Sequence, residues 1–97
     1  PVDVARNMTD MIKEKNPAAV AVLAVSGDGK LNFLAAAGKE AVALGAHAGK
    51  LVGAVAAVTG GKGGGRPDNA MAGGRDIDQI PEALSTAEVV LGGMLKD

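Results

Sequence analysis

The segment GGKGGGRPDNAMAGG, residues 60–74, constrains the fold of this chain more than any other, because it holds seven of the fifteen glycines. Glycine loses more conformational freedom on folding than any other residue, so a cluster of glycines needs a local reason. Two interpretations compete: a flexible linker, or a loop that a phosphate-bearing partner approaches closely. The tail RPDNAMAGG is not of low complexity, and the segment joins two elements that must pack together, so a linker is disfavoured.

The spacing of the basic residues excludes two nucleotide-binding signatures. A P-loop needs Gly-Lys followed by Ser or Thr, whereas Lys62 is followed by Gly63 and Lys50 by Leu51. The G-x-G-x-x-G pattern fails because Arg66 stands three residues after Gly63. An anion nest of successive glycine N–H groups still fits the segment, with Lys62 and Arg66 supplying positive charge. The alternative is architectural: the glycines pack the loop tightly on its own sheet and contact no ligand.

The composition argues against catalysis and metal binding by the chain itself. It contains no cysteine and one histidine, His47, and its carboxylates are scattered, so neither a metal site nor a nucleophile–base pair can be assembled. We therefore expect a domain that is not an enzyme and needs no cofactor. The formal net charge is −1, so any anion-binding site must be local. His47 stands at the start of a predicted helix and is expected to be a surface or capping residue.

The single aromatic residue, Phe33, bears on the kind of partner. Proteins that bind single-stranded nucleic acid stack bases on several aromatic side chains, whereas a folded RNA can be recognised through its backbone and shape. The longest uncharged runs fall short of the ~20 apolar residues that a membrane helix needs. The chain starts at Pro1 rather than methionine, and we expect one globular domain, residues 1–97, excised from a longer protein.

Hydrophobic periodicity predicts a helix and then a hairpin in the first forty residues. The helix would end at Asn16–Pro17, and one apolar stripe follows its period. That stripe is Val4, Met8, Met11 and Ile12. The run AAVAVLAV reads as a buried strand, and SGDGK, residues 26–30, is a tight-turn signal. LNFLAAAG then returns as the second strand, with Leu31 and Phe33 on one face.

The second half of the chain predicts helices on either side of the glycine-rich segment. Residues 47–59 form one, which Gly60 terminates, and NAMAGG, residues 69–74, is a candidate short strand. Pro81 suits the first turn of a last helix, whose apolar stripe is Leu84, Ala87, Leu91 and Leu95. Met8, Met11, Met71 and Met94 are most simply core fillers. The expected fold is α/β: a single small domain with a small mixed sheet and an early β-hairpin, covered by helices.

GGKGGGRPDNAMAGG resembles the glycine-rich signature of the C-terminal (C-Ala) domain of alanyl-tRNA synthetases, a member of the DHH-associated domain family. AGKLVGAVAAVTGG extends the similarity upstream, and LGGMLKD resembles the end of such a synthetase. Arg-Pro-Asp after the glycines is typical of the synthetase branch, since related phosphodiesterases and nucleases carry a glycine–histidine version. Asn69 and Met71 depart from the family pattern, which more often has an apolar residue and a glutamine at these positions.

The resemblance implies a tRNA-binding module without chemistry of its own. In this family the domain grips the elbow of alanine tRNA, where the D and T loops meet, and supports aminoacylation and editing by upstream domains. ATP and zinc are then expected only in those upstream domains. The implied partners are alanine tRNA and the rest of the synthetase chain, with a homodimer as an open alternative. A cytoplasmic location without membrane contact is implied as well.

The resemblance and the anion-nest hypothesis together predict the residues that contact RNA. They are Gly61, Lys62, Gly63, Gly64, Gly65, Arg66, Asp68 and Arg75. For Lys39 and Lys50, a solvated surface lysine is as good an interpretation as a phosphate contact.

Two other function classes stay open at this point. The chain could be the substrate-recognition half of a DHH-type phosphodiesterase, whose metal-binding aspartates and histidines would lie in an upstream domain. It could also be a self-association module, as the alanine-rich faces and the apolar stripe of the first helix suggest.

Overall fold

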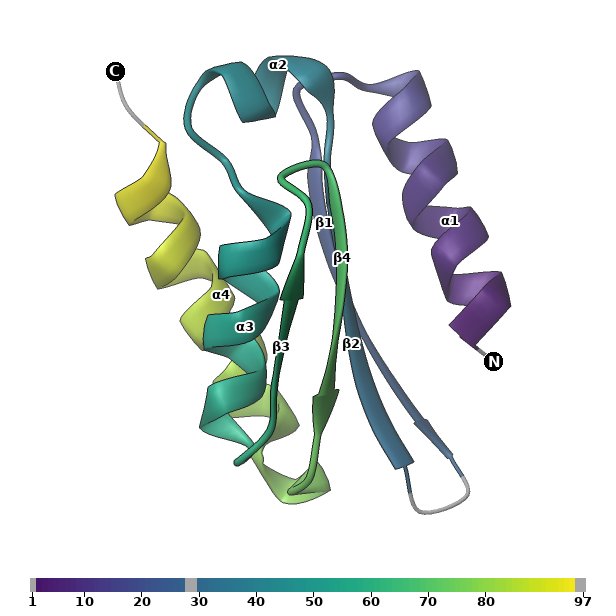
Figure 1. Ribbon diagram of the computed structural model, residues 1–97, viewed down its shortest axis with the longest axis vertical. Coiled ribbons are helices and arrows are strands. Elements are labelled where there is room, and N and C mark those ends of the chain that lie inside the picture. Colours follow the sequence, from purple (N-terminus) through teal and green to yellow (C-terminus); the bar gives the residue numbers. More distant parts are fainter. Residues whose placement is uncertain (1, 28–29, 96–97) are drawn as a thin grey trace.

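The computed structural model describes residues 2–27 and 30–95, with side chains from Val4 onward (Figure 1). The helices are α1 (Val2–Lys15), α2 (Lys39–Ala43), α3 (Ala48–Val58) and α4 (Ile80–Met94), the last entered through a 3₁₀ turn, η1 (Ile77–Gln79). The strands are β1 (Val20–Gly27), β2 (Lys30–Ala37), β3 (Lys62–Gly65) and β4 (Asn69–Gly74). None of the described helices combines the length and the hydropathy that crossing a bilayer requires.

The four strands form one sheet in the order β1-β2-β4-β3. The α/β class and the early hairpin are confirmed, since β1 pairs with β2 from Val20 opposite Ala37 to Gly27 opposite Lys30. The predicted turn residues 28 and 29 lie outside the described part of the chain. Every neighbouring pair of described strands is antiparallel, so the expectation of a mixed sheet is wrong. The α3 crossover leaves β2 and β3 running in the same direction, but β4 lies between them and opposes both.

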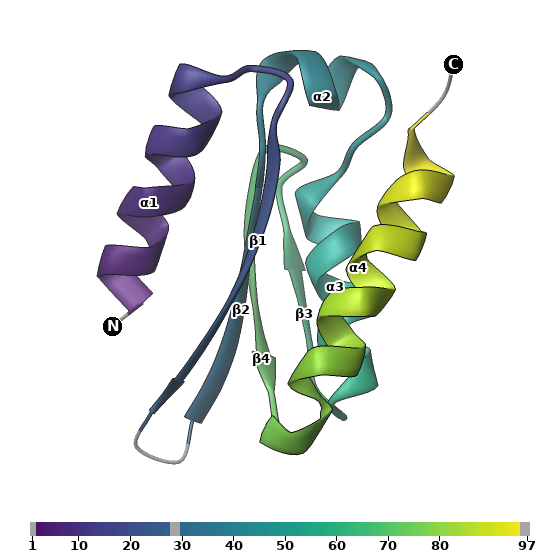
Figure 2. The ribbon, with the colours of Figure 1, turned by 180° about the vertical axis from the view of Figure 1, so that it is seen from behind.

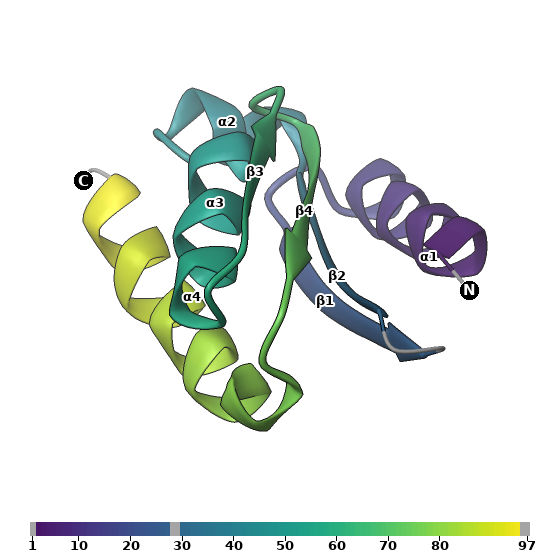
Figure 3. The same ribbon diagram turned by 60° about the horizontal axis from the view of Figure 1, so that its bottom comes forward.

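Helices cover both faces of the sheet. α1 packs on β1 and β2, while α3 and α4 pack together on the opposite face (Figures 1 and 3). Both faces of β2 are therefore buried: Phe33 is fully buried on the side of α3, and its neighbour Leu34 is buried on the other side. The apolar core next to α3 and α4 includes Leu31, Phe33, Leu51, Val52, Val55, Ala83 and Ala87. The predicted common face of Leu31 and Phe33 is thus confirmed.

The apolar stripe of α1 does not face the core. Val4, Met8 and Met11 are 55%, 51% and 53% exposed, and Ile12 is 39% exposed. Met71 is exposed as well, so the prediction that the methionines fill the core is wrong for three of the four. The helical period was correct, but periodicity alone does not say which of two neighbouring faces a sheet will cover.

α1 instead contacts the sheet through small residues. Among the α1 side chains from Val4 onward, Ala5 and Thr9, one helical turn apart, are the buried ones. The Thr9 hydroxyl donates to the carbonyl oxygen of Arg6 at 2.8 Å, so its polar atom is satisfied inside the contact. Small side chains at the contact let α1 lie close to the sheet, which leaves its larger apolar residues at the rim.

The local signals at the helix ends are confirmed. His47 caps α3, because its Nδ1 accepts the Lys50 N–H with an N···N distance of 3.1 Å. Gly60, just past the end of that helix, has φ 80°, the left-handed conformation that favours glycine. Pro81 lies in the first turn of α4, where its missing N–H costs no hydrogen bond.

Candidate functional site

The predicted glycine loop is a strand followed by a tight tip. Residues 62–65 form β3, which pairs with β4 across the tip residues 66–68. The expectation of a loop is wrong because pairing with β4 and packing on α3 override the low strand propensity of glycine. Among the glycines of the described part of the chain, only Gly45 and Gly60 have positive φ. A nest needs backbone of alternating handedness, so the nest geometry is wrong, and any anion contact must rest on other features.

Packing against β4 requires three glycines of this segment. A Cβ at Gly63 would lie 2.5 Å from the Cα of Ala72 in the opposing strand, a backbone atom that cannot rotate away. Cβ atoms at Gly61 and Gly65 would also press into β4. For these three residues the architectural interpretation is therefore sufficient.

The same close approach occurs on the other side of β3, against α3. A Cβ at Gly49 would overlap the carbonyl oxygen of Gly65, and one at Gly53 would lie 3.0 Å from that of Gly63. Gly49 and Gly53 are four residues apart and share one face of α3. This helix thus lies with a glycine face directly on the backbone of the edge strand.

Two further glycines, Gly64 and Gly73, have no packing reason. A Cβ at Gly64 would make only an ordinary contact of 3.7 Å, and one at Gly73 would meet nothing within 4 Å. Neither residue has positive φ. Both share the outer face of the hairpin with Lys62, since Lys62 pairs with Gly73 and alternate residues share a face.

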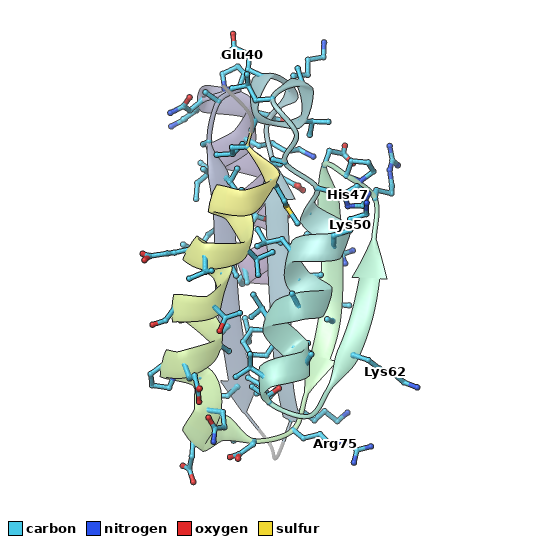
Figure 4. All side chains as sticks on the ribbon, turned by 90° about the vertical axis from the view of Figure 1, so that its left-hand side faces the viewer. Glu40, His47, Lys50, Lys62 and Arg75 are labelled. Atoms are coloured by element: carbon cyan, nitrogen blue, oxygen red, sulfur yellow. The ribbon has the colours of Figure 1, made fainter. Side chains whose placement is uncertain are left out.

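A cleft of about 480 Å³ lies at the end of β3 away from the tip. The residues that line it are Gly60, Gly61, Lys62, Gly73, Gly74 and Arg75. Among these described lining residues there are two cations and no carboxylate. Figure 4 shows both cationic side chains reaching away from the ribbon near this end of β3. We call this feature the Lys62–Arg75 cleft, and its charge and bare backbone suit a phosphate group.

Asp76, the acidic residue directly after the cleft in sequence, is engaged locally. The carboxylate of Asp76 accepts the backbone N–H of Asp78 at 3.1 Å and caps η1. The backbone N–H of Arg75 donates to the Thr59 hydroxyl at 3.4 Å, which ties the start of this segment to the end of α3. This bond fixes the backbone of Arg75 beside the cleft.

The other predicted residues, Arg66 and Asp68, lie at the hairpin tip. Nε of Arg66 is 3.4 Å from Oδ1 of Asp68, and Nζ of Lys13 on α1 is 3.6 Å from its Oδ2. Asp68 therefore balances two cations. The groove beside it has a volume of about 680 Å³, and its lining includes three carboxylates, Asp10, Glu14 and Asp68. This groove has no preference for anions comparable to that of the Lys62–Arg75 cleft.

The N-terminus of α3 is occupied by the hairpin tip. The N–H of Ala48 donates to the Pro67 carbonyl at 2.8 Å, and the N–H of Gly49 donates to that of Arg66 at 3.1 Å. Together with the His47 cap, these bonds satisfy the first amides of the helix. They fix the tip and offer no free amide to a phosphate.

The predicted site residues thus fall into two clusters. Gly61, Lys62 and Arg75 meet at the cleft, whereas Arg66 and Asp68 lie at the tip with the strand between them. Sequence reasoning missed Gly73, because its role depends on its pairing with Lys62. The one available signal was the Gly-Gly pair directly before Arg75. Lys39 and Lys50 do not line the cleft, and Figure 4 shows Lys50 beside His47 near the start of α3.

The chain matches known proteins over nearly all of its length. The family model of the DHHA1 domain matches residues 1–93. The alanine–tRNA ligase of Alkaliphilus oremlandii is 47% identical over 94 residues, which cover 97% of this chain and 11% of that protein. The alanine–tRNA ligase of Shouchella clausii is 51% identical over 83 residues, or 86% of this chain and 10% of that protein. The chain thus spans about a tenth of the length of these curated relatives.

A solved structure has the same fold. The crystal structure of the C-Ala domain from Aquifex aeolicus alanyl-tRNA synthetase superposes with a TM-score of 0.81 and 33% sequence identity. The superposition covers 91% of this chain and 78% of that one.

Proposed function

Because the chain belongs to the DHHA1 domain family and is homologous to the C-Ala domain of alanyl-tRNA synthetase, we propose that it is a non-catalytic module that grips the elbow of alanine tRNA. Its curated relatives are named alanine–tRNA ligases, and tRNA is the substrate in that name. In this proposal the chain supports aminoacylation and editing that other domains of a longer protein carry out.

The Lys62–Arg75 cleft is the proposed point of contact. The single observation that carries this choice is the cleft's lining of two cations and bare glycine backbone without a carboxylate. The absent side chain of Gly73 leaves room for a sugar–phosphate backbone to rest on the sheet, since no packing contact requires a glycine there. The exposed Lys62 and Arg75 then neutralise phosphate charge.

The burial of Phe33 favours a folded RNA over a single strand. It is the only aromatic residue in the sequence, and it is fully buried in the core. No aromatic surface is therefore available for stacking bases. Recognition through phosphates and shape is the mode that remains, and the tRNA elbow offers a compact surface of that kind.

Binding to alanine tRNA and to a hairpin RNA that lacks the elbow tests the proposal. We expect salt-sensitive binding to the tRNA, a loss of at least about 10-fold in Lys62→Ala/Arg75→Ala, and a salt slope lower by roughly two phosphate contacts. Lys15→Ala/Lys39→Ala removes the same charge far from the cleft and serves as the matched control.

The variant Gly73→Ala separates close approach from charge. It keeps both cations and adds a methyl group to open space, so the fold should persist while RNA binding weakens. If the chain bound the hairpin RNA without an elbow as tightly as it binds alanine tRNA, recognition of the elbow would be refuted. If Lys62→Ala/Arg75→Ala bound the tRNA as tightly as the unchanged chain does, the cleft would not be the point of contact.

A further inference from the structure

Arg66, at the tip of the β3–β4 hairpin, has a rigid backbone. Its N–H donates to the carbonyl oxygen of Asn69 at 3.2 Å, and its own carbonyl oxygen accepts the Gly49 N–H at 3.1 Å. The next residue, Pro67, has a fixed φ, and its carbonyl oxygen accepts the Ala48 N–H at 2.8 Å. Figures 1 and 2 both show the tip below α2 and beside the start of α3. The point from which the Arg66 side chain leaves the backbone is therefore set by the fold.

The side chain of Arg66 is restrained at one end and open at the other. Its Nε is 3.4 Å from Oδ1 of Asp68, and the side chain is 82% exposed. A guanidinium carries five N–H donors in a planar fork, and Nε bears one of them. The donors on the two terminal nitrogens thus face solvent, in the geometry that binds a phosphate through two parallel hydrogen bonds.

Asp68 is itself held in place from two directions. Nζ of Lys13 on α1 is 3.6 Å from Oδ2 of Asp68, the oxygen other than the one that Arg66 contacts, and the Lys13 side chain is only 24% exposed. The carbonyl oxygen of Asp68 accepts the Ala37 N–H at 3.0 Å, which ties this residue to the end of β2. Two cations share one carboxylate, so these three side chains together keep a net positive charge. Asp68 therefore restrains Arg66, while Lys13 offsets the charge of the carboxylate.

Gly64 lies between the tip and the Lys62–Arg75 cleft. It is two residues from Lys62 and two from Arg66, and it shares the outer face of the hairpin with Lys62. Neither packing nor backbone conformation requires a glycine here. Gly73 lines the cleft, whereas Gly64 lines the groove beside the tip, as Arg66 does. An RNA backbone that crosses from the cleft to the tip would pass over Gly64, which gives this glycine a function.

The length of β3 suits two separate phosphate contacts. Lys62 and Arg66 stand four residues apart along this extended segment, which places their Cα atoms roughly 13 Å apart. Phosphates of one nucleic-acid strand recur about every 3.4 Å of helix axis. This spacing is shorter than the separation of the two residues, so each side chain can contact a phosphate of its own.

We propose that Arg66 is a second phosphate contact for the RNA that binds at the Lys62–Arg75 cleft, and that Asp68 is the positioning residue of Arg66. The inference rests on the proposed function, because it needs an RNA backbone at the cleft. A long side chain loses conformational freedom when it binds a partner, and the contact with Asp68 removes part of that freedom in advance. A carboxylate beside a phosphate site is otherwise unfavourable, so the positioning role can be tested by the sign of an effect.

Asp68→Asn separates positioning from charge. The change keeps the size of the side chain and makes the chain one unit more positive, so electrostatics alone predicts tighter binding of alanine tRNA. Because Asp68 orients Arg66, we expect binding to weaken instead, by about 2- to 10-fold. Glu14→Gln is the matched control: it removes the same charge from the groove beside the tip, and among the described residues no ion pair links Glu14 to Arg66. Its binding should be unchanged or tighter.

Arg66→Ala tests the contact itself. It should weaken binding of alanine tRNA at least about 10-fold and lower the salt slope by roughly one phosphate contact. In this background Asp68→Asn should cause no further loss, because no arginine is left to position. A loss that persisted there would show that Asp68 only stabilises the tip, and it would overturn the positioning role. Arg66→Lys should keep the salt slope but bind more weakly, because an ammonium group has neither Nε nor the planar fork.

Gly64→Ala tests the path between the two contacts. Its methyl group would make only an ordinary contact, so the fold should persist while binding of alanine tRNA weakens. Binding as tight as that of the unchanged chain would show that the RNA does not cross Gly64.

The outcomes distinguish this inference from the proposed function. Full binding by Arg66→Ala, together with a loss in Lys62→Ala/Arg75→Ala, would overturn the second contact and leave the cleft in place. Equal or tighter binding by Asp68→Asn would overturn the positioning role. If the unchanged chain bound no alanine tRNA even at low salt, both the second contact and the proposed function would be overturned.

Discussion

Replacing Gly63 with alanine tests whether packing accounts for the glycines of β3. The new methyl group would lie 2.5 Å from the Cα of Ala72, and the strand cannot retreat because its carbonyl oxygen already faces Gly53 of α3. Overpacking of this kind costs about 1–3 kcal/mol. The loss of glycine flexibility in the unfolded chain offsets about 0.4–1 kcal/mol of this cost. We therefore expect a net destabilisation of roughly 1–2 kcal/mol.

The neighbouring substitution Gly64→Ala is the matched control. Its methyl group would point to the opposite face of β3, where the nearest atom, the carbonyl oxygen of Gly49, is at an ordinary 3.7 Å. With no positive φ at this residue, the change should stabilise the fold by about 0.4–1 kcal/mol. The two variants have identical compositions and should differ in free energy of unfolding by about 2 kcal/mol, or roughly 8–16 °C in Tm.

Thermal and urea unfolding followed by far-ultraviolet circular dichroism measures this difference. The chain has no tryptophan or tyrosine, so intrinsic fluorescence is of little use. A Gly64→Ala variant that melts at or below the temperature of Gly63→Ala would refute the reasoning. It would mean that the two faces of β3 are reversed, or that β3 does not pack on α3 in solution.

Three further experiments address the core, a helix cap and an ion pair. Phe33→Ala empties a fully buried position and should lower the free energy of unfolding by about 3–5 kcal/mol. Because this is a large part of the stability of a small domain, calorimetry should show a strongly lowered Tm. An unchanged Tm would contradict the burial of Phe33. His47→Ala removes the cap of α3 and should cost about 1 kcal/mol, whereas His47→Asn should restore most of it; equal urea midpoints for the two would argue against a capping role. The charged atoms of Lys13 and Asp68 are 3.6 Å apart at a partly exposed site. A double-mutant cycle should therefore give a coupling free energy below about 1 kcal/mol. A larger value would show that the pair anchors α1.

Local patterns were sufficient for most of the elements. The hairpin of β1 and β2, the helix over residues 47–59 and the last helix beginning near Pro81 all follow from hydrophobic runs bounded by turn or cap residues. These signals act between residues close in sequence, so no knowledge of the rest of the fold is needed to interpret them. The same holds for the His47 cap and for Gly60 after α3.

The glycine-rich segment could not be understood in this way. Its glycines were identified as the distinctive feature, but β3 is a strand only because β4 pairs with it and α3 packs on it. Both partners are set by tertiary structure. The division between Gly63, which packing requires, and Gly73, which it does not, depends on which backbone atoms lie opposite, and the sequence carries no sign of that.

The candidate site shows the same limit. Lys62 and Arg75 were both named from the sequence as cations near glycines, but they share a cleft only because Lys62 pairs with Gly73, two residues before Arg75. Arg66 is closer to Lys62 in sequence, yet it lies at the other end of the strand and faces Asp68.

The sequence by itself determined the class of fold, the hairpin, the main helices and their caps, because these depend on periodicity and on short-range backbone preferences. Only the tertiary structure decided which face of α1 is covered, which glycines are structural, and which cations meet. Each of these depends on contacts between segments far apart in the chain, such as α3 on β3 and the small residues Ala5 and Thr9 of α1 against the sheet. Such contacts are set by shape and by the burial of apolar surface across the whole domain.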